Sequence, residues 1–189
     1  MIVIDDYHAT WPDEFEALKA DLGEILGPMA LSIDHIGSTS VPGLAAKDVI
    51  DIQVSVASLT PEIVRRLTAA GYRDKADVSH DHVPAGENEH HALWAKLLFA
   101  QPEGQRRANI HFRVIGNPNQ RYPLLFRGYL RAHPNSARSV AAIKQALAER
   151  HADDVEAYYD IKDPVYDLIW EAAQEWVRFN GKEGNDVND

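Results

Sequence analysis

The sequence contains no cysteine. That absence excludes disulfide bonds, thiolate metal sites and a cysteine nucleophile. The sequence also lacks an apolar run of the roughly 20 residues that a membrane-spanning helix requires. Its first residues show no basic segment or cleavage site, so no secretory signal is expected. We therefore expect a cytoplasmic protein with no membrane partner.

Positive charge is scarce as well. The sequence has 19 Lys and Arg against 29 Asp and Glu, which gives a formal net charge of -10. A general nucleic-acid binder presents a basic face, so we expect no nucleic-acid partner. The charge is nevertheless uneven, because residues 105–131 contain six arginines and no acid, whereas residues 149–175 are rich in Asp and Glu. A small anionic ligand could therefore bind against the overall charge.

Two common catalytic motifs are missing too. There is no Gly-x-x-x-x-Gly-Lys-[Ser/Thr], which excludes a P-loop kinase, and no Gly-x-Ser-x-Gly elbow that would support a hydrolase.

The length of 189 residues is typical of one domain with a full core. We expect this domain to cover residues 1–180 and a disordered tail to cover residues 181–189, which are rich in Gly, Asn and Asp. Helical spacing of apolar residues and strand-like alternation predict these elements: helices over 11–26, 60–71, 122–133, 136–151 and 155–178, and strands over 30–36, 48–56, 71–78, 92–100 and 108–115. A helix break is expected at Pro134, and Pro164 is a second candidate for one. Strands early and helices late indicate an α+β domain with a helical C-terminal part.

The most informative segment covers residues 34–56. Gly37 allows a close approach of the backbone, and Ser38, Thr39 and Ser40 add hydroxyl donors, so this turn could hold phosphate oxygens. Asp51 lies in an apolar strand, where a carboxylate without a partner would be costly. It therefore needs a metal ion, a cation or a set of donors. A tight structural connection, with Asp51 only accepting N–H bonds, is the alternative.

This segment resembles the signature of nucleotidyltransferase-fold proteins, a hydrophobic-Gly-[Gly/Ser] turn followed by acid-x-acid on a strand. Twelve residues separate Ser38 from Asp51, which fits that spacing. The longer string from His35 to Lys47, with Ile-Asp-Ile at 50–52, is similar to the signature of the GrpB family. These are largely uncharacterised bacterial proteins, sometimes fused to dephospho-CoA kinase. Further matches lie at residues 109–111, 126–134 and 158–162, so the resemblance covers roughly residues 8–177.

The resemblance implies a nucleotidyltransferase-like mixed β-sheet flanked by helices. It also implies binding of a nucleoside triphosphate or a related phosphorylated metabolite, with Mg²⁺ and ATP or another nucleotide as the expected ligands. Asp51 would ligate Mg²⁺, and Gly37, Ser38 and Ser40 would hold phosphate. If the protein is a Mg²⁺-dependent nucleotidyltransferase, His111 could act as base or ligand, provided that its strand neighbours that of Asp51.

Six further residues are candidates for contacting phosphate or closing the pocket. They are Lys47, Lys96, Arg127, Arg131, Tyr158 and Lys162. Arg127 and Arg131, like Tyr158 and Lys162, are four positions apart and so share a helix face. Ordinary pairing with acids on a solvated helix face is the alternative for these residues.

The chain departs from the family pattern at three positions. Gln53 replaces the second acid of the pair, Gly128 stands where the family usually has Asp, and Asp48 stands where it usually has Pro. The first two changes remove carboxylates that could bind metal ions. The second hypothesis is therefore a non-catalytic nucleotide- or metabolite-binding regulatory module that has lost the full acidic set.

Residues 79–91 form a polar stretch with four histidines, at positions 80, 82, 90 and 91. His80 and His82 have the spacing of a zinc ligand pair, so a metal-dependent enzyme built on this loop is a third hypothesis. A solvated loop is the preferred interpretation, because no second closely spaced pair of ligands supports a zinc site.

Overall fold

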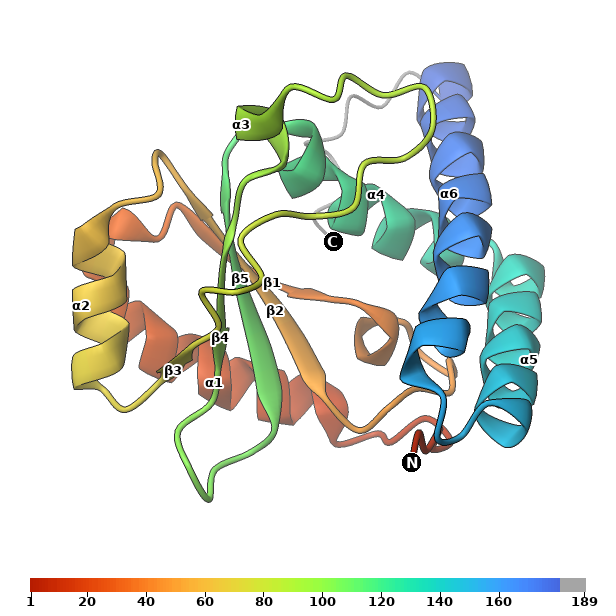
Figure 1. The fold of residues 1–189 in the computed structure, drawn as a ribbon, viewed down its shortest axis with the longest axis horizontal. Coiled ribbons are helices and arrows are strands. Elements are labelled where there is room, and N and C mark those ends of the chain that lie inside the picture. The colour runs from red at the N-terminus through yellow and green to blue at the C-terminus, as the bar shows by residue number, and fades with distance from the viewer. Residues whose placement is uncertain (181–189) are drawn as a thin grey trace.

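A computed structural model describes residues 1–180. The expected disordered tail at 181–189 lies outside the described residues. The chain forms one five-stranded mixed sheet with the strand order β1-β2-β5-β4-β3 (Figure 1). The strands are β1 (Ser32–Ile36), β2 (Ile50–Val56), β3 (Arg73–Asp74), β4 (Leu97–Ala100) and β5 (Ala108–Val114). β2 and β5 are parallel, and the other neighbouring pairs are antiparallel.

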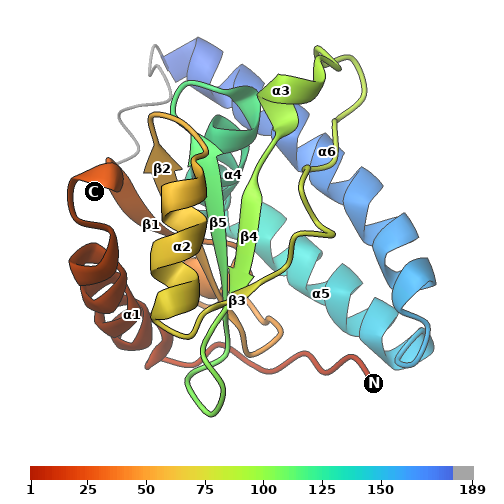
Figure 2. The same ribbon diagram turned by 60° about the vertical axis from the view of Figure 1, so that its left-hand side comes forward.

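Residues 1–180 contain six α-helices, and five of them cover the two faces of this sheet (Figure 2). The six are α1 (Trp11–Leu26), α2 (Pro61–Ala69), α3 (His91–Trp94), α4 (Pro118–Ala132), α5 (Pro134–Arg150) and α6 (Val155–Asn180). α1 and α2 lie on one face, and α4, α5 and α6 form a layer on the other side. The expected α+β architecture with a helical C-terminal part is confirmed.

The side chains of β2 point alternately to the two faces of the sheet, one apolar and one polar. Ile50, Ile52 and Val54 are fully buried in the main apolar cluster, together with residues of α1 and α2. Asp51 and Gln53 project from the opposite face, toward the layer of C-terminal helices. The sheet therefore presents its acid to the space between the sheet and those helices.

Four details differ from the sequence-based expectations. The strand predicted over residues 71–78 shrinks to the two residues of β3. Residues 91–94 form the short helix α3, so the strand predicted over 92–100 shrinks to β4. α4 begins at Pro118, four residues before the predicted start. α6 continues through Pro164, because contacts of Tyr158 on one side and Trp170 on the other hold both halves of the helix, which offsets the missing backbone donor.

The polar loop of residues 75–90 runs from β3 toward α6 and returns to α3 (Figure 1). Glu87 accepts hydrogen bonds from Trp170 Nε1 (2.9 Å) and Gln174 Nε2 (2.7 Å) of α6. The loop thus connects the sheet to the C-terminal layer. None of the helices over residues 1–180 has the length and apolar character that crossing a membrane would take.

Candidate functional site

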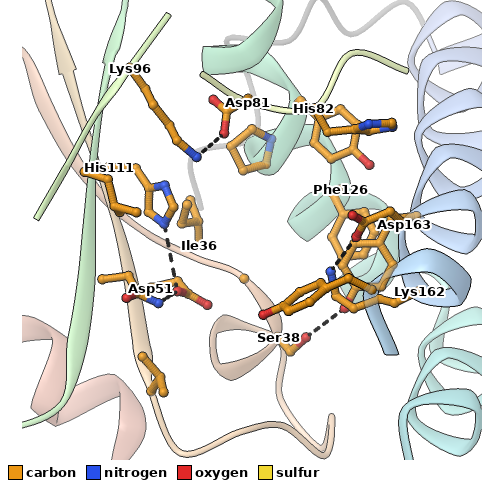
Figure 3. A pocket seen from close by; sticks show the side chains of 18 of the residues that line it. Ile36, Ser38, Asp51, Asp81, His82, Lys96, His111, Phe126, Lys162 and Asp163 are labelled. Atoms are coloured by element: carbon orange, nitrogen blue, oxygen red, sulfur yellow. Dashed lines mark hydrogen bonds and ion pairs between the residues drawn. The ribbon is translucent and has the colours of Figure 1, made fainter. Parts of the chain in front are cut away.

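A cavity of about 640 Å³ lies between the polar face of the sheet and the C-terminal helices (Figure 3). Its volume is within the range of small-molecule sites, which is roughly 300–1,000 Å³. The cavity brings together nine of the residues proposed from the sequence: Gly37, Ser38, Thr39, Lys47, Asp51, Lys96, His111, Tyr158 and Lys162.

The turn after β1 is held against the strand acid. Ile36 is the register partner of Asp51 in the antiparallel pair β1–β2, so the turn begins directly beside the carboxylate. Gly37 has φ +69° and ψ -171°, a combination that is essentially restricted to glycine. A Cβ at this position would lie 2.5 Å from Asp51 Oδ2. Glycine is therefore required both by the backbone and by the space available.

The two predicted arginines of α4 lie on the other side of this turn. Arg127 Nη1 donates to the backbone oxygen of His35 (2.8 Å), and Arg131 donates from Nε and Nη2 to that of Ser40 (3.1 and 2.8 Å). Both line a separate hollow of about 320 Å³, together with Ser40. Ser40 Oγ itself donates to the Gly37 oxygen (2.6 Å). These three side chains support the turn and do not face the main cavity.

Asp51 has one close protein partner. Asn109, its register partner on β5, donates from Nδ2 to Asp51 Oδ1 (2.9 Å), and His111 Nε2 lies 4.0 Å from the same oxygen. The side chain is 32% exposed, and the open part faces the cavity. Burial raises the pKa of Asp51, while Asn109 and the charge of Lys162 act in the opposite direction.

His111 is engaged on its other nitrogen. The Arg113 guanidinium, which can only donate, lies 3.2 Å from His111 Nδ1. The neutral ring therefore carries its proton on Nε2, the nitrogen on the side of Asp51. Burial and the nearby charge of Arg113 lower the pKa of His111 well below 6.5. To act as a base or metal ligand through Nε2, this histidine would have to give up its bond to Arg113.

Gln53 takes the place of a second acid and has a structural partner on each side. It is fully buried; its Oε1 accepts from Arg113 Nη1 (2.9 Å) and its Nε2 donates to the Gln120 backbone oxygen (2.9 Å). A carboxylate here would lose the second of these bonds, so the amide suits this position. Gln53 is thus part of the support for Arg113.

Asp81, from the histidine loop, is the acid that balances the buried cations of the sheet. It accepts two bonds from Arg113 (2.7 and 2.9 Å) and one from Lys96 (2.7 Å). Burial alone would raise the pKa of Asp81, but Arg113 and Lys96 bring it well below its usual range. Sequence reasoning missed this role, because the loop showed no pattern that connects residue 81 to β5.

Three lysines converge on the part of the cavity that lies away from Asp81. Lys144 of α5 is only 4% exposed, and its Nζ donates to the Ala45 backbone oxygen (2.7 Å). No acid lies within ion-pair distance of it among residues 1–180. Lys47 Nζ lies 4.4 Å from the centre of the Tyr158 ring, and Lys162 Nζ lies 3.9 Å from that of Tyr166.

The charge of one lysine lowers the pKa of the others. Burial lowers the pKa of Lys144 to about 7, with a further contribution from the charge of Lys162. Burial and Lys162 also lower the pKa of Lys47. The sequence carried a signal for Lys144: it falls in an otherwise apolar series on the buried side of α5, with Ala137, Val140 and Leu147.

The lining as a whole is cationic, although the chain is acidic. Six Lys and Arg side chains line the cavity against three carboxylates: Lys47, Lys75, Lys96, Arg113, Lys144 and Lys162 against Asp51, Asp81 and Asp163. Asp81 is already shared by Arg113 and Lys96. Asp163 is paired with Lys162 (3.1 Å). The excess positive charge therefore lies around Lys47 and Lys144, next to this ion pair.

The two histidines of the proposed zinc ligand pair do not converge. His80 Nε2 lies 3.1 Å from His91 Nδ1, with the two rings tilted by 43°, whereas His82 Nε2 bonds Asp167 Oδ2 on α6 (2.9 Å). The proposed ligand pair therefore points in two directions. Within residues 1–180, no group of three or more His, Asp or Glu side chains is placed to hold a metal ion.

Comparisons with known proteins agree on the family pattern. Residues 1–172 match the family described as "GrpB protein". Curated relatives include the UPF0157 protein YqkA of Bacillus subtilis, 34% identical over 172 residues (91% of this chain, 47% of the relative). Another is a dephospho-CoA kinase of Mycolicibacterium paratuberculosis, 37% identical over 185 residues (90% of this chain, 46% of the relative). The chain thus spans less than half the length of these two relatives.

Solved structures include a GrpB protein with a similar fold. The crystal structure of the conserved protein GrpB from Enterococcus faecalis superposes with a TM-score of 0.74 and 29% identity, covering 92% of this chain and 99% of that one. Cid1 in complex with its short product ApU superposes with a TM-score of 0.51 and 18% identity, covering 78% and 43%. The second likeness concerns the fold alone.

The packing of Gly37 against Asp51 predicts an unequal response of two glycines. Gly37→Ala should lower the free energy of unfolding more than Gly43→Ala. Both positions have positive φ, which costs a non-glycine residue about 1–2 kcal/mol, but a Cβ at Gly43 meets nothing within 4 Å. In an Asp51→Ala background the extra loss at Gly37 should shrink. Urea denaturation measures these differences, and equal losses at the two glycines would contradict the close packing.

The buried charge of Lys144 predicts a stability that depends on pH. The pKa of Lys144 is about 7 in the folded protein, against 10.5 as its ordinary value. Between these values the unfolded chain binds more protons, so stability rises with pH over this window. Lys144→Met should be more stable than the unaltered protein at pH 6, with an advantage that shrinks toward pH 10. Urea denaturation at pH 6, 8 and 10 tests this, with Lys19→Met as the control; a gap independent of pH would be inconsistent with it.

Proposed function

Since the chain belongs to the GrpB family, we propose that its cavity binds a phosphorylated small molecule, with a nucleoside triphosphate such as ATP as the leading candidate. The observation that carries this proposal is the buried ammonium of Lys144, which lies beside Lys47 and Lys162 and has no carboxylate partner among residues 1–180. A buried charge without a partner is destabilising. A phosphate group in the cavity would supply the missing negative charge.

The position of the turn supports the same ligand. Gly37 and Ser38 line the cavity next to Asp51, and Ser38 Oγ lies 3.4 Å from the Tyr166 hydroxyl (Figure 3). Phosphate oxygens near Ser38 would be within the zone of positive potential of the three lysines. The rings of Tyr122, Phe126 and Tyr158 line the remaining wall and suit the organic part of the ligand.

Mg²⁺ would find one protein ligand in this site. Asp51 is the carboxylate that faces the cavity without a cationic partner, whereas the Gln53 oxygen is occupied by Arg113. Mg²⁺ in nucleotide sites often takes one or two carboxylates and completes its shell with phosphates and water. Asp51 therefore fits a Mg²⁺ ion that arrives with the nucleotide, where the ion would neutralise phosphate charge. The described residues do not offer the acids of a two-metal site.

The second candidate function is Mg²⁺-dependent nucleotidyl transfer. What favours it is the close contact of the Gly37 turn with Asp51, in a fold that resembles that of Cid1. Binding without turnover is placed first, because Arg113 engages both Gln53 and His111. The kinase activity named for the longer relatives is not carried over, since this chain spans less than half their length and lacks the P-loop motif.

The lysines give the first test of the proposal. Isothermal titration should show binding of ATP and of inorganic triphosphate, with affinity that falls as salt rises. Lys47→Ala and Lys162→Ala should each weaken binding by roughly tenfold or more, because each removes a charged hydrogen-bond donor. Lys19→Ala, at a lysine outside the cavity, should leave affinity unchanged. Failure of the unaltered protein to bind either compound would refute the proposal.

Asp51 gives the second test. Mg²⁺ should strengthen ATP binding by the unaltered protein, and Asp51→Asn should remove this gain while keeping metal-free binding. Affinity that responds to Mg²⁺ equally in both proteins would exclude Asp51 as the ligand. The same samples, incubated with ATP and candidate acceptors, distinguish the two functions: pyrophosphate release that depends on Asp51 indicates transfer, and its absence despite binding indicates a binding module.

A further inference from the structure

The cavity has a second end, away from the Gly37 turn and the three lysines. Asp81 and His82 of the polar loop lie there, whereas Asp51 and Ser38 lie at the opposite end (Figure 3). Asn119 and Tyr122, from the first turns of α4, line the cavity as well.

The orientation of the Asn119 amide is fixed by its neighbours. Its Nδ2 donates to Asp81 Oδ2 (3.1 Å) and to the Ala95 backbone oxygen (3.0 Å). Both partners are acceptors, so the nitrogen must face them and Oδ1 must point elsewhere. Asn119 is only 1% exposed, and its Oδ1 has no hydrogen-bond partner among residues 1–180. A buried acceptor that lacks a donor is rare and costly in a folded protein.

No group around Asn119 donates to this oxygen in the structure. Lys96 and Arg113 both bond Asp81 instead. Burial and the charge of Asp167 raise the pKa of the Tyr122 hydroxyl, so this group stays protonated. Asp167 itself has a buried Oδ1 without a partner, while its Oδ2 accepts from His82. Two buried acceptor oxygens, Asn119 Oδ1 and Asp167 Oδ1, are therefore without a donor among residues 1–180.

We infer that the Asn119 end of the cavity is a subsite for a ligand group that donates a hydrogen bond through N–H or O–H, with Asn119 Oδ1 as its acceptor. This inference rests on the proposed function, because it assigns the phosphates of the same ligand to the lysine end. The ligand is therefore bipolar: it is anionic at one end and carries an amino or hydroxyl group at the other. In a nucleotide, either the exocyclic amino group of the base or a sugar hydroxyl supplies such a donor.

Isothermal titration with three probes tests the subsite: ATP, purine riboside 5′-triphosphate, which lacks the amino group of adenine, and inorganic triphosphate. The unaltered protein should bind ATP roughly tenfold more tightly than inorganic triphosphate, the effect of one well-formed hydrogen bond. Asn119→Leu should lose roughly this tenfold preference for ATP, with unchanged affinity for inorganic triphosphate. Asn135→Leu, at an exposed asparagine of α5, is the matched control and should behave as the unaltered protein does.

The purine riboside probe identifies the donor. Affinity equal to that of ATP assigns the sugar hydroxyl, and affinity equal to that of inorganic triphosphate assigns the amino group. If Asn119→Leu does not fold, Tyr122→Phe keeps the ring and removes the hydroxyl beside the subsite; it should reduce ATP affinity several-fold and leave inorganic triphosphate unaffected.

Two results would overturn the inference while leaving the proposed function intact. One is equal affinity of the unaltered protein for ATP and inorganic triphosphate. The other is a preference for ATP that is undiminished in Asn119→Leu, or in Tyr122→Phe where that variant replaces it. Absence of binding by all three probes would instead reject the proposed function, and the subsite with it.

Discussion

The ammonium of Lys144 lies inside the protein with no acid within ion-pair distance among residues 1–180, and only the more distant charge of Asp51 partly offsets it. The proposed ligand site is built around this charge. α5 places it on a buried face where an apolar residue would be the ordinary choice. Lys47 and Lys162 add charge of the same sign within reach, which makes the free cavity less stable than a neutral one would be. We propose that an anionic ligand removes this cost, in which case the lysine cluster would connect stability to anion binding.

The buried cations at β4 and β5 are already paired. Asp81 joins the polar loop to β4 and β5 through Lys96 and Arg113, and Arg113 also anchors Gln53. These buried bonds hold the shape of the cavity, and through Arg113 they also occupy the Gln53 oxygen and Nδ1 of His111. Ligand binding is placed ahead of catalysis because Arg113 and Lys96 are paired with an acid, whereas Lys144 has no such partner within the described residues.

The sequence was sufficient for the fold and for one end of the site. Alternation in residues 48–56 placed Asp51 and the apolar residues on opposite faces, and the Gly-Ser turn was expected beside Asp51. Both are local features, fixed by strand geometry and by one tight connection. The family resemblance extended this to the architecture as a whole, which the GrpB crystal structure supports.

The positions of residues that are far apart in the sequence but meet in the fold could not be predicted in the same way. Arg127 and Arg131 share a helix face, as expected, but the packing of α4 on β1 turns that face toward the back of the turn, outside the cavity. Asp81 and Asn119 lie 38 positions apart in the sequence, and only the path of the polar loop brings them together. Lys144 was detectable as an irregularity in an apolar series, although its partners depend on how α5 and α6 pack.

The most direct test of the uncompensated charge is to follow Lys144 by NMR, using ¹³C-labelled lysine side chains assigned with Lys144→Met. Titration of the free protein should give a pKa of about 7 for this lysine. Saturating inorganic triphosphate should raise that pKa by more than one unit, because a bound anion favours the charged form. A pKa near 10.5 in the free protein, or no change with the anion present, would contradict the account.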